Sequence, residues 1–163
     1  MGDASLHPKR AAESRVTLAQ VMLPEDANSQ GHVHGGTIMK LVDTVAAVAA
    51  MRHARRRVAT VYMDGMSFLS PVFVGNLVTV KAAVNAVWRT SMEVGVRVEA
   101  EDLLSGRVTH TSSAYLDMVA LDERGTPTPV PPLAVETDEE RRRWEAAQER
   151  RTRRLRAVGR EGV

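Results

Sequence analysis

The chain has 163 residues, of which 44% are hydrophobic and only 4% aromatic, and its formal net charge is +2. This length suits one domain with short extensions, and the apolar content is enough for a core of Val, Ala, Leu and Met. The chain contains no cysteine, which excludes disulfides, thiolate metal sites and a cysteine nucleophile, and agrees with a cytoplasmic location. Because no secretory signal and no run of about 18 apolar residues is present, we expect neither export nor a membrane span.

The positive charge is concentrated at the C-terminal end. Residues 1–134 contain 13 Lys or Arg and 13 Asp or Glu, whereas residues 135–163 contain nine Arg against seven acids. The stretch 150–160 holds six Arg and no acid. Since the rest of the chain is balanced, we expect a basic tip rather than the basic face of a nucleic-acid-binding domain, and no nucleic-acid or membrane partner.

The N-terminal part of the chain contains one strand between two irregular segments. Residues 1–15 are polar and have no regular period, so we expect a flexible leader. Residues 16–23 (VTLAQVML) predict a strand, and residues 24–31 form a loop of turn-forming residues. A helix is predicted next and ends near residues 53–54, where three arginines follow, because cations are favourable at a helix C-terminus.

This helix holds a candidate catalytic group. From residue 38 to 51 only three residues are polar, which predicts a helix buried on nearly every side, and one of the three is Asp43. A buried carboxylate is costly unless it is paired or used, and burial raises a carboxylate's pKa, so Asp43 is a candidate general base. Gly35 and Gly36 let backbone N–H groups at the helix start approach a ligand, where the helix dipole favours negative charge. A base and an oxyanion-stabilising turn about two helical turns apart are the parts of a hydrolytic acyl-transfer site.

The same residues also allow a structural interpretation. Taken by itself, a single Asp in a helix more often has a structural role, such as a hydrogen bond across a subunit contact. Structural ion pairs and polar networks perturb pKa values just as catalytic sites do, so a perturbed carboxylate does not by itself indicate catalysis. A His-Gly-Gly sequence can be an ordinary turn. The choice between the two interpretations therefore depends on the rest of the chain.

Antiparallel strands follow the helix. The expected segments are residues 58–63, 66–69, 77–88, 90–101 and 107–121. Residues 90–101 alternate between apolar and charged side chains, which is typical of a half-buried strand in an antiparallel sheet. By the same alternation we place Ala86 and Trp88 on the apolar face of their strand, and Val108 and His110 on the apolar face of the last strand.

The C-terminal part is extended and then helical. Residues 126–133 are rich in proline, and residues 137–157 predict a second helix that Thr137 or Asp138 can cap. This helix is charged nearly all round, so we expect it to lie solvated on the domain surface.

One strand, a buried helix and four or five antiparallel strands define an α+β fold. A helix that is apolar on every side needs a curved sheet on one side and a second copy of the protein on the other. We therefore expect the hot dog fold, an antiparallel sheet wrapped around a long central helix, over residues 16–134. A charged C-terminal helix and tail follow over residues 135–163.

Three stretches, in order, resemble the acyl-CoA thioesterases of the hot dog superfamily, in the bacterial group related to vertebrate cytosolic acyl-CoA hydrolases. They are residues 22–43, which contain the Gly pair and Asp43, residues 67–76, and residues 89–94 (RTSMEV). The exit at residues 119–133 and the charged tail helix also fit. His-Gly-Gly alone would be a weak signal, whereas all these pieces in order, over roughly residues 16–150, are a strong one.

The resemblance implies a role for each matching residue. Asp43 is expected to act as base or nucleophile on an acyl-CoA thioester, and the N–H of Gly35 to polarise its carbonyl, with Gly36 giving close access. Coenzyme A thiolate is a good leaving group, so no general acid is required. The resemblance further implies a place in fatty acid metabolism, a dimer or a trimer of dimers, and no cofactor or metal, because coenzyme A is part of the substrate.

A second group of residues is expected to bind the nucleotide end of the substrate. Arg89, Thr90 and Ser91 match the family's phosphate-contacting hairpin, and Arg and hydroxyl donors suit phosphate oxygens. The alternative for these three residues is an ordinary turn with an exposed Arg. One position departs from the family: His32 stands where members often carry an Asn that helps orient the thioester or water, and Asn28 is a nearby substitute.

Other functions remain open on the sequence alone. A hot dog hydratase would use a helix-borne His, whereas this helix offers Asp43 without an adjacent His. A non-enzymatic, acyl-CoA-binding regulator could touch DNA with its basic tip, but no helix-turn-helix pattern precedes residue 16. A pure scaffold would leave Asp43 unexplained. Gly-x-Ser-x-Gly and zinc-peptidase motifs are absent from the sequence.

Overall fold

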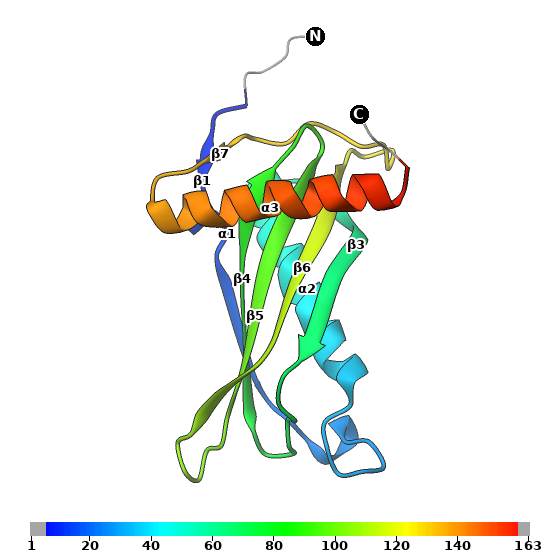
Figure 1. Ribbon diagram of the computed structural model, residues 1–163. Helices are drawn as coiled ribbons and strands as arrows, with labels where there is room; N and C mark the ends of the chain where they lie inside the picture. Colours follow the sequence, from blue (N-terminus) through cyan, green and yellow to red (C-terminus); the bar gives the residue numbers. More distant parts are fainter. Residues whose placement is uncertain (1–5, 160–163) are drawn as a thin grey trace.

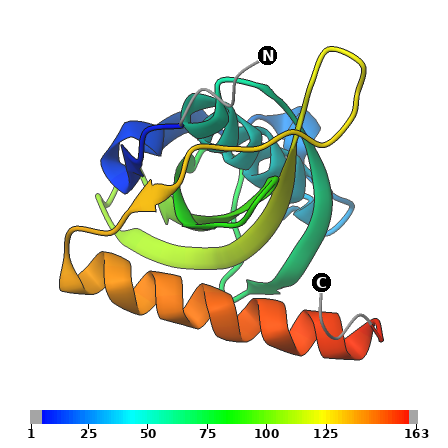
Figure 2. The ribbon, with the colours of Figure 1, turned by 90° about the horizontal axis from the view of Figure 1, so that it is seen from above.

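The computed structural model describes residues 6–159. A five-stranded antiparallel sheet of order β2-β4-β5-β6-β3 curls around the long helix α2, while helix α3 crosses the outer side of the sheet (Figures 1 and 2). A short parallel pair, β1 with β7, ties the N-terminal segment to the chain that leads into α3. The α+β architecture predicted from the sequence is confirmed. In the described part of the chain, no helix is long and apolar enough to cross a bilayer.

The elements follow the predicted order with few exceptions. They are β1 (Lys9–Arg10), α1 (Ala11–Ser14), β2 (Val16–Val21), a 3-10 turn η1 (Pro24–Asp26), α2 (Gly35–Ala54), β3 (Arg57–Phe68), β4 (Leu77–Val87), β5 (Ser91–Glu101), β6 (Val108–Leu121), β7 (Leu133–Ala134) and α3 (Asp138–Ala157). The two short strands expected at 58–63 and 66–69 are one strand, β3, whose pairing with β6 shifts register twice.

The core lies between α2 and the inner face of the sheet. Helix α2 begins after His34, whose Nδ1 accepts a hydrogen bond from the Gly36 N–H at 3.0 Å, and it ends at Arg55 in the left-handed conformation. The helix directs mostly small side chains toward the sheet, and the sheet contributes Val, Ala, Leu and Met. The buried cluster includes Ile38, Val42, Val45, Ala46, Ala49, Ala50, Val78, Val80, Val94, Val98, Leu116 and Met118.

The opposite side of α2 is not covered, so the prediction of a helix buried on nearly every side is wrong for one chain. Met39, Lys40, Thr44 and Met51 are exposed, and Asp43 is half-buried. A single sheet can cover only one side of a helix. The apolar residues on the other side therefore need a cover that this chain does not supply.

A β-bulge at Asn85 reverses which face of the sheet the side chains at the end of β4 point to. Val84 pairs with Val94, but Ala86 pairs with Glu93, so one residue is skipped and the facing of the strand changes. The expectation that Ala86 and Trp88 share the inner, apolar face is therefore wrong. Trp88 lies on the outer side, where its Nε1–H donates to Gln148 of α3 at 3.1 Å.

A second bulge, at Thr111 in β6, has the same effect. Val98 pairs with Ser112, whereas the next residue of β5, Glu99, pairs with His110. Val108 and His110 consequently turn to the outer side, again contrary to the expectation. Val108 is 58% exposed, which agrees with this facing.

Residues 9–14 are ordered and packed rather than part of a flexible leader. The Ser14 hydroxyl is fully buried, accepts a hydrogen bond from the Val84 N–H at 2.9 Å and donates to the Ala11 carbonyl at 2.7 Å. Lys9 Nζ donates to the His53 carbonyl at 2.8 Å, at the C-terminal end of α2. Residues 1–5 of the expected leader lie outside the described residues.

Helix α3 is bound to the sheet by buried ion pairs, which the expectation of a solvated helix did not include. Glu93 of β5 and Asp117 of β6 stand directly opposite each other on the outer face, 0% and 6% exposed. Arg150 donates to both carboxylate oxygens of Glu93, at 2.7 and 3.0 Å, and Arg154 pairs with Asp117. These arginines of the expected basic tip are engaged by acids of the same chain, while Arg160 lies outside the described residues.

Removing Arg150 tests whether these pairs hold α3 in place. Arg150→Ala leaves the Glu93 carboxylate buried without its cation, and such a loss typically costs about 3–5 kcal/mol. As a matched control, Arg143→Ala breaks only the exposed pair with Glu139 on the same helix and should cost less than about 1 kcal/mol. Urea unfolding of both variants measures the two losses, and equal losses would contradict this account.

Asp117 should make stability depend on pH. Burial raises its pKa from 3.8 to about 6, although the neighbouring Arg154 opposes the shift. Between about pH 4 and 6 the folded protein therefore binds more protons than the unfolded chain, and the contribution of Asp117 to stability falls as pH rises through this window. In Asp117→Asn the group cannot titrate, so the unfolding free energy of the variant minus that of the wild type should rise from pH 4 to 6 and then level off. A flat or falling difference would refute the assignment.

Candidate active site

Asp43 is held by a hydroxyl from the edge strand of the sheet. Thr60 of β3 donates from Oγ1 to Asp43 Oδ1 at 2.6 Å, and the same hydroxyl lies 3.3 Å from Met118 Sδ. Because a hydroxyl has one proton, the shorter contact with the carboxylate takes it. No Lys, Arg or His of residues 6–159 forms an ion pair with Asp43. One carboxylate oxygen is thus fixed, and the other is left for a substrate or a water molecule.

The start of α2 presents a backbone donor. The Gly36 N–H is used by the capping His34 ring, whereas the Gly35 N–H meets no acceptor among the described residues. A Cβ at Gly36 would lie 3.1 Å from His34 Nδ1, and a Cβ at Gly35 would lie 3.5 Å from the ring of Phe68. Glycine therefore preserves the cap at one position and an open approach at the other. A free N–H at a helix N-terminus favours a developing negative charge.

Gly35 and Asp43 of one chain lie too far apart to act on the same carbonyl. They are separated by eight residues of α2, or about 12 Å along the helix axis. A carbonyl hydrogen-bonded to the Gly35 N–H would need the base within reach of a single intervening water. The two candidate groups of each chain therefore lie at different levels of the same helix.

Exposed apolar side chains lie on α2 and at the end of β3. Phe68 and Leu69 at the end of β3 are 52% and 61% exposed, and Met39 of α2 is also exposed. Strand β3 is at the edge of the sheet, so the backbone groups on its outer edge pair with no other described strand. A patch of this kind on a sheet edge marks an interaction surface.

Asn28 and His32 lie in the loop before α2, at the Gly35 level. Asn28 Oδ1 accepts hydrogen bonds from the N–H groups of Gln30 and His32, at 2.9 and 3.3 Å. This fixes the orientation of the amide and turns its NH₂ group away as a donor that meets no acceptor in residues 6–159. The His32 ring packs edge-on against Phe73, with centroids 5.1 Å apart. Neither side chain is hydrogen-bonded to Asp43 of the same chain.

The hairpin of Arg89, Thr90 and Ser91 joins β4 to β5 at the Asp43 level. Thr60 pairs with Met118, and Met118 pairs with Met92, the residue after the hairpin. The hairpin backbone is held by the Val130 N–H, which donates to the Arg89 carbonyl at 3.1 Å, and by the Ala120 N–H, which donates to the Thr90 carbonyl at 2.9 Å. The Arg89 side chain is exposed.

Sequence reasoning missed Thr60. The only signal was a polar residue within an apolar strand, and its relevance depends on the register that places it against Asp43. Residues 6–159 contain no group of three His, Cys, Asp or Glu able to hold a metal ion.

Proteins that resemble this chain in sequence and fold include thioester hydrolases. Residues 30–107 match the family model described as the thioesterase superfamily. The chain is 38% identical over 128 residues to the uncharacterized acyl-CoA thioester hydrolase YkhA of Bacillus subtilis, a match that covers 78% of this chain and 74% of the relative. A solved apo-hexameric acyl-CoA thioesterase is 38% identical with a TM-score of 0.90, covering 93% of this chain and 97% of its own.

A third similar protein has been solved with ligands. The acyl-CoA hydrolase of Staphylococcus aureus, in complex with butyryl coenzyme A, coenzyme A and coenzyme A disulfide, is 32% identical with a TM-score of 0.83. The match covers 93% of this chain and 94% of that chain. Variants of the same hydrolase with an aspartate, an asparagine or a threonine replaced by alanine have also been solved.

Proposed function

The chain belongs to the thioesterase superfamily as an acyl-CoA thioester hydrolase, and we propose that Asp43 is the group that starts the hydrolysis. The hydrogen bond from Thr60 to Asp43 carries this proposal, because it fixes a half-buried carboxylate that no cation of the described residues neutralises. The aspartate, asparagine and threonine variants of the S. aureus hydrolase support the choice of these residue types.

The reaction follows from the donors and acceptors at hand. The thioester carbonyl oxygen accepts a hydrogen bond from the Gly35 N–H, which stabilises the negative charge that develops on it. Asp43 takes a proton from a water molecule as the water oxygen bonds to the carbonyl carbon, and the C–S bond then breaks. Coenzyme A leaves as thiolate, and the free acid remains. In the variant route that the sequence left open, Asp43 attacks directly and water hydrolyses the resulting anhydride.

We propose that the complete site forms between two copies of the chain. Gly35 and Asp43 of one chain lie about 12 Å apart along the helix axis. They can act on the same carbonyl if a second copy of the chain brings its Gly35 to the Asp43 of the first copy. The exposed apolar residues around β3 and α2 supply the surface for such a pair. A dimer or a trimer of dimers is the proposed assembly, and the hexameric form of a relative with a TM-score of 0.90 supports it.

The remaining residues are assigned to binding and orientation. We propose that Asn28 rather than His32 orients the thioester or the water, because the Asn28 NH₂ group is free to donate while the His32 ring packs against Phe73. Arg89 and the hydroxyls of Thr90 and Ser91 are proposed to meet coenzyme A phosphates. A cytoplasmic location is proposed from the substrate class, since acyl-CoA is made and consumed inside cells.

Two observations argue against the alternative functions, a DNA-binding regulator and a hydratase. A regulator that touches DNA through its basic end would need free arginines, yet Arg150 and Arg154 are bound to buried acids. A hydratase would need a histidine beside the helix carboxylate, whereas the partner of Asp43 is Thr60.

Asp43→Asn tests the proposed base. Removal of a general base typically lowers the rate by about 10²–10⁴-fold, so kcat for acyl-CoA hydrolysis should fall by that factor while coenzyme A still binds. A thiol-release assay across acyl chain lengths and calorimetry with coenzyme A measure the two quantities. Asp138→Asn, at an exposed aspartate of α3, is the control and should keep wild-type activity. Wild-type turnover in Asp43→Asn would end the proposal.

Thr60 is proposed as a positioning residue, and two substitutions separate its hydroxyl from its shape. Thr60→Val removes the donor, and a hydrogen bond to a charged group is worth about 1.5–3 kcal/mol, so kcat should fall about 10–100-fold. Thr60→Ser keeps the donor and should retain most of the activity. Equal losses of kcat in both variants would indicate a packing role only.

A further inference from the structure

The tight turn between β4 and β5 lacks the backbone conformation that such turns favour. It consists of Arg89 and Thr90, and the Trp88 N–H closes it by donating to the Ser91 carbonyl at 2.8 Å. Tight turns between antiparallel strands favour residues with positive φ, because the twist of these turns matches the twist of the strands. Arg55 is the only non-glycine residue of 6–159 with a positive φ, so neither residue of this turn has one. The shape of the turn therefore depends on contacts from outside it.

Trp88, at the base of the turn, makes such a contact with α3. The bulge at Asn85 places its half-buried side chain on the outer side of the sheet, where α3 crosses β4 and β5 near the turn (Figure 1). Trp88 Nε1–H donates to Gln148 Oε1 at 3.1 Å, and the guanidinium carbon of Arg151 lies 4.3 Å from the centroid of the Trp88 ring. One turn of α3 thus contacts both the edge and the face of the indole ring.

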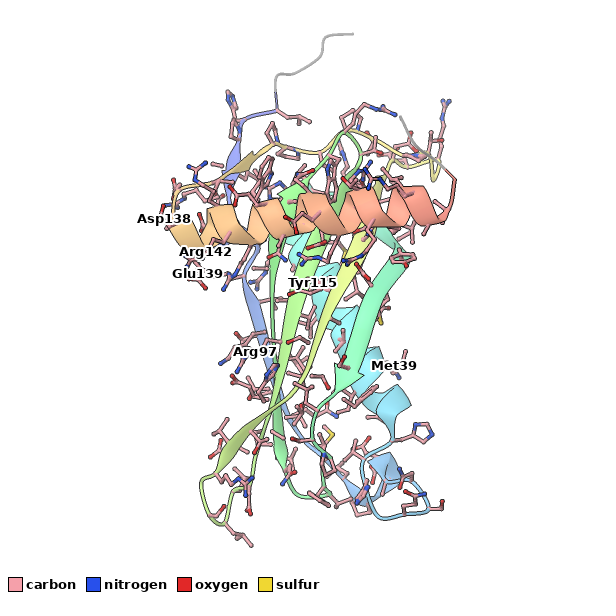
Figure 3. The ribbon with its side chains drawn as sticks, in the orientation of Figure 1. Met39, Arg97, Tyr115, Asp138, Glu139 and Arg142 are labelled. Carbon is pink, nitrogen blue, oxygen red and sulfur yellow. The ribbon has the colours of Figure 1, made fainter. Side chains whose placement is uncertain are left out.

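The polar contacts between α3 and the sheet come from the C-terminal half of the helix. In the part of the chain that the structure describes, the hydrogen bonds and ion pairs that join the two start from residues 148–154. Arg150 pairs with Glu93, which stands in β5 just after the turn. Figure 3 shows Tyr115 beneath the middle of α3 and Asp138 at its N-terminal end. The half of α3 that bonds to the sheet therefore also holds both sides of the turn.

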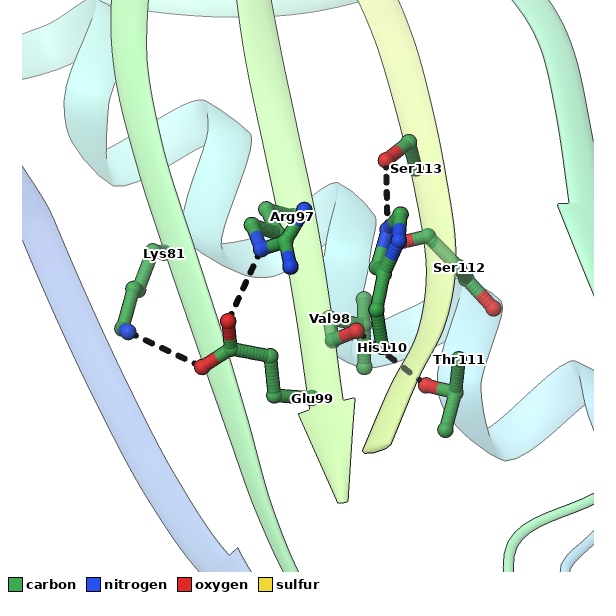
Figure 4. A network of polar contacts seen from close by, with 8 residues as sticks. All are labelled: Lys81, Arg97, Val98, Glu99, His110, Thr111, Ser112 and Ser113. Atoms are coloured by element: carbon green, nitrogen blue, oxygen red, sulfur yellow. Dashed lines mark hydrogen bonds and ion pairs between the residues drawn. The ribbon is translucent and has the colours of Figure 1, made fainter. Parts of the chain in front are cut away.

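Farther from the turn, side chains of the outer face bind one another. Lys81 and Arg97 share the carboxylate of Glu99, with bonds of 2.9 and 2.8 Å (Figure 4). His110 Nε2 lies 2.9 Å from Ser113 Oγ in the same network (Figure 4). Within residues 6–159, these side chains form no hydrogen bond or ion pair with α3. The polar contacts of α3 therefore act on the turn end of β4 and β5 and not on the whole length of these strands.

We propose that Trp88 is a positioning residue, which fixes the turn of Arg89 and Thr90 to α3 through Gln148 before the substrate arrives. The inference rests on the proposed contact of this turn with coenzyme A phosphates. Binding is tighter when the donors are already ordered, because less conformational freedom is lost on binding. Trp88 lies on the outer side of the sheet, whereas α2 and Asp43 lie on its inner side (Figure 2). The contribution of Trp88 therefore falls on binding of the nucleotide end and not on hydrolysis.

Two substitutions remove the hydrogen bond between Trp88 and Gln148 from opposite ends. Trp88→Phe keeps a ring for Arg151 but loses the donor, and Gln148→Met keeps the length of the side chain but loses the acceptor. Each should raise KM for acyl-CoA, and Kd for coenzyme A in calorimetry, about two- to tenfold with kcat unchanged, which is the effect of one neutral hydrogen bond. The double variant should match the single variants, because both substitutions remove the same bond. Thr152→Val, at an exposed position one turn farther along α3, is the control and should bind coenzyme A as the wild type does.

A thioester without phosphates separates positioning from a general structural role. Acyl-N-acetylcysteamine lacks the nucleotide, so Trp88→Phe and Gln148→Met should hydrolyse it with wild-type kinetics. Equal losses with acyl-CoA and acyl-N-acetylcysteamine, or a lower free energy of unfolding with an unchanged KM for acyl-CoA, would overturn the proposal.

Arg89→Ala tests the underlying phosphate contact by itself, since it removes a proposed donor and leaves Trp88 in place. If Arg89→Ala raises KM for acyl-CoA while Trp88→Phe and Gln148→Met do not, the phosphate contact stands and the positioning role of Trp88 is wrong. If all three variants keep the wild-type KM, the phosphate contact fails and this inference fails with it.

Discussion

One curved sheet can bury only one side of the helix it surrounds, and the place of the candidate site depends on that constraint. The small residues of α2 pack into the inner face of the sheet, and the side that carries Met39 and Asp43 stays open in a single chain. The open side holds the candidate site, because a carboxylate at the boundary of the core can be fixed by Thr60 and still reach a substrate. Burial and access are thus divided between two sides of the same helix.

The outer side of the sheet is organised by a different interaction. Glu93 and Asp117 face each other across neighbouring strands, where two carboxylates would repel unless cations meet them. Arg150 and Arg154 meet them from α3, and Arg150 also lies 3.6 Å above the Tyr115 ring. These guanidinium groups are therefore removed from water and contact both aromatic rings and carboxylates. Arginine suits such a position better than lysine, because its planar group can stack on a ring and pair with a carboxylate. This explains why so charged a helix lies flat on the sheet.

Much of the fold was accessible from periodicity and end signals. The apolar run of α2, the alternation in β5 and the Thr137 cap of α3 are local patterns, and each predicted its element correctly. The errors arose where one residue changes the register: the bulges at Asn85 and Thr111 turn Trp88 and His110 outward, and no local pattern reveals a skipped residue. Thr60 was missed for a similar reason, since its relevance depends on which helix residue lies across from it. Asp43 and Gly35 could be selected as candidates from the sequence, because a carboxylate within an apolar helix and a glycine pair at its start are local patterns.

The spacing of Gly35 and Asp43 also bears on how the protein behaves when it is scarce. If each reaction centre draws its amide from one chain and its carboxylate from another, an isolated chain retains both groups yet cannot combine them. Specific activity would then follow the law of mass action and decline on dilution as pairs separate, even though every molecule stays folded. The concentration of the chain inside the cell would set not only how many centres exist but what fraction of chains forms one.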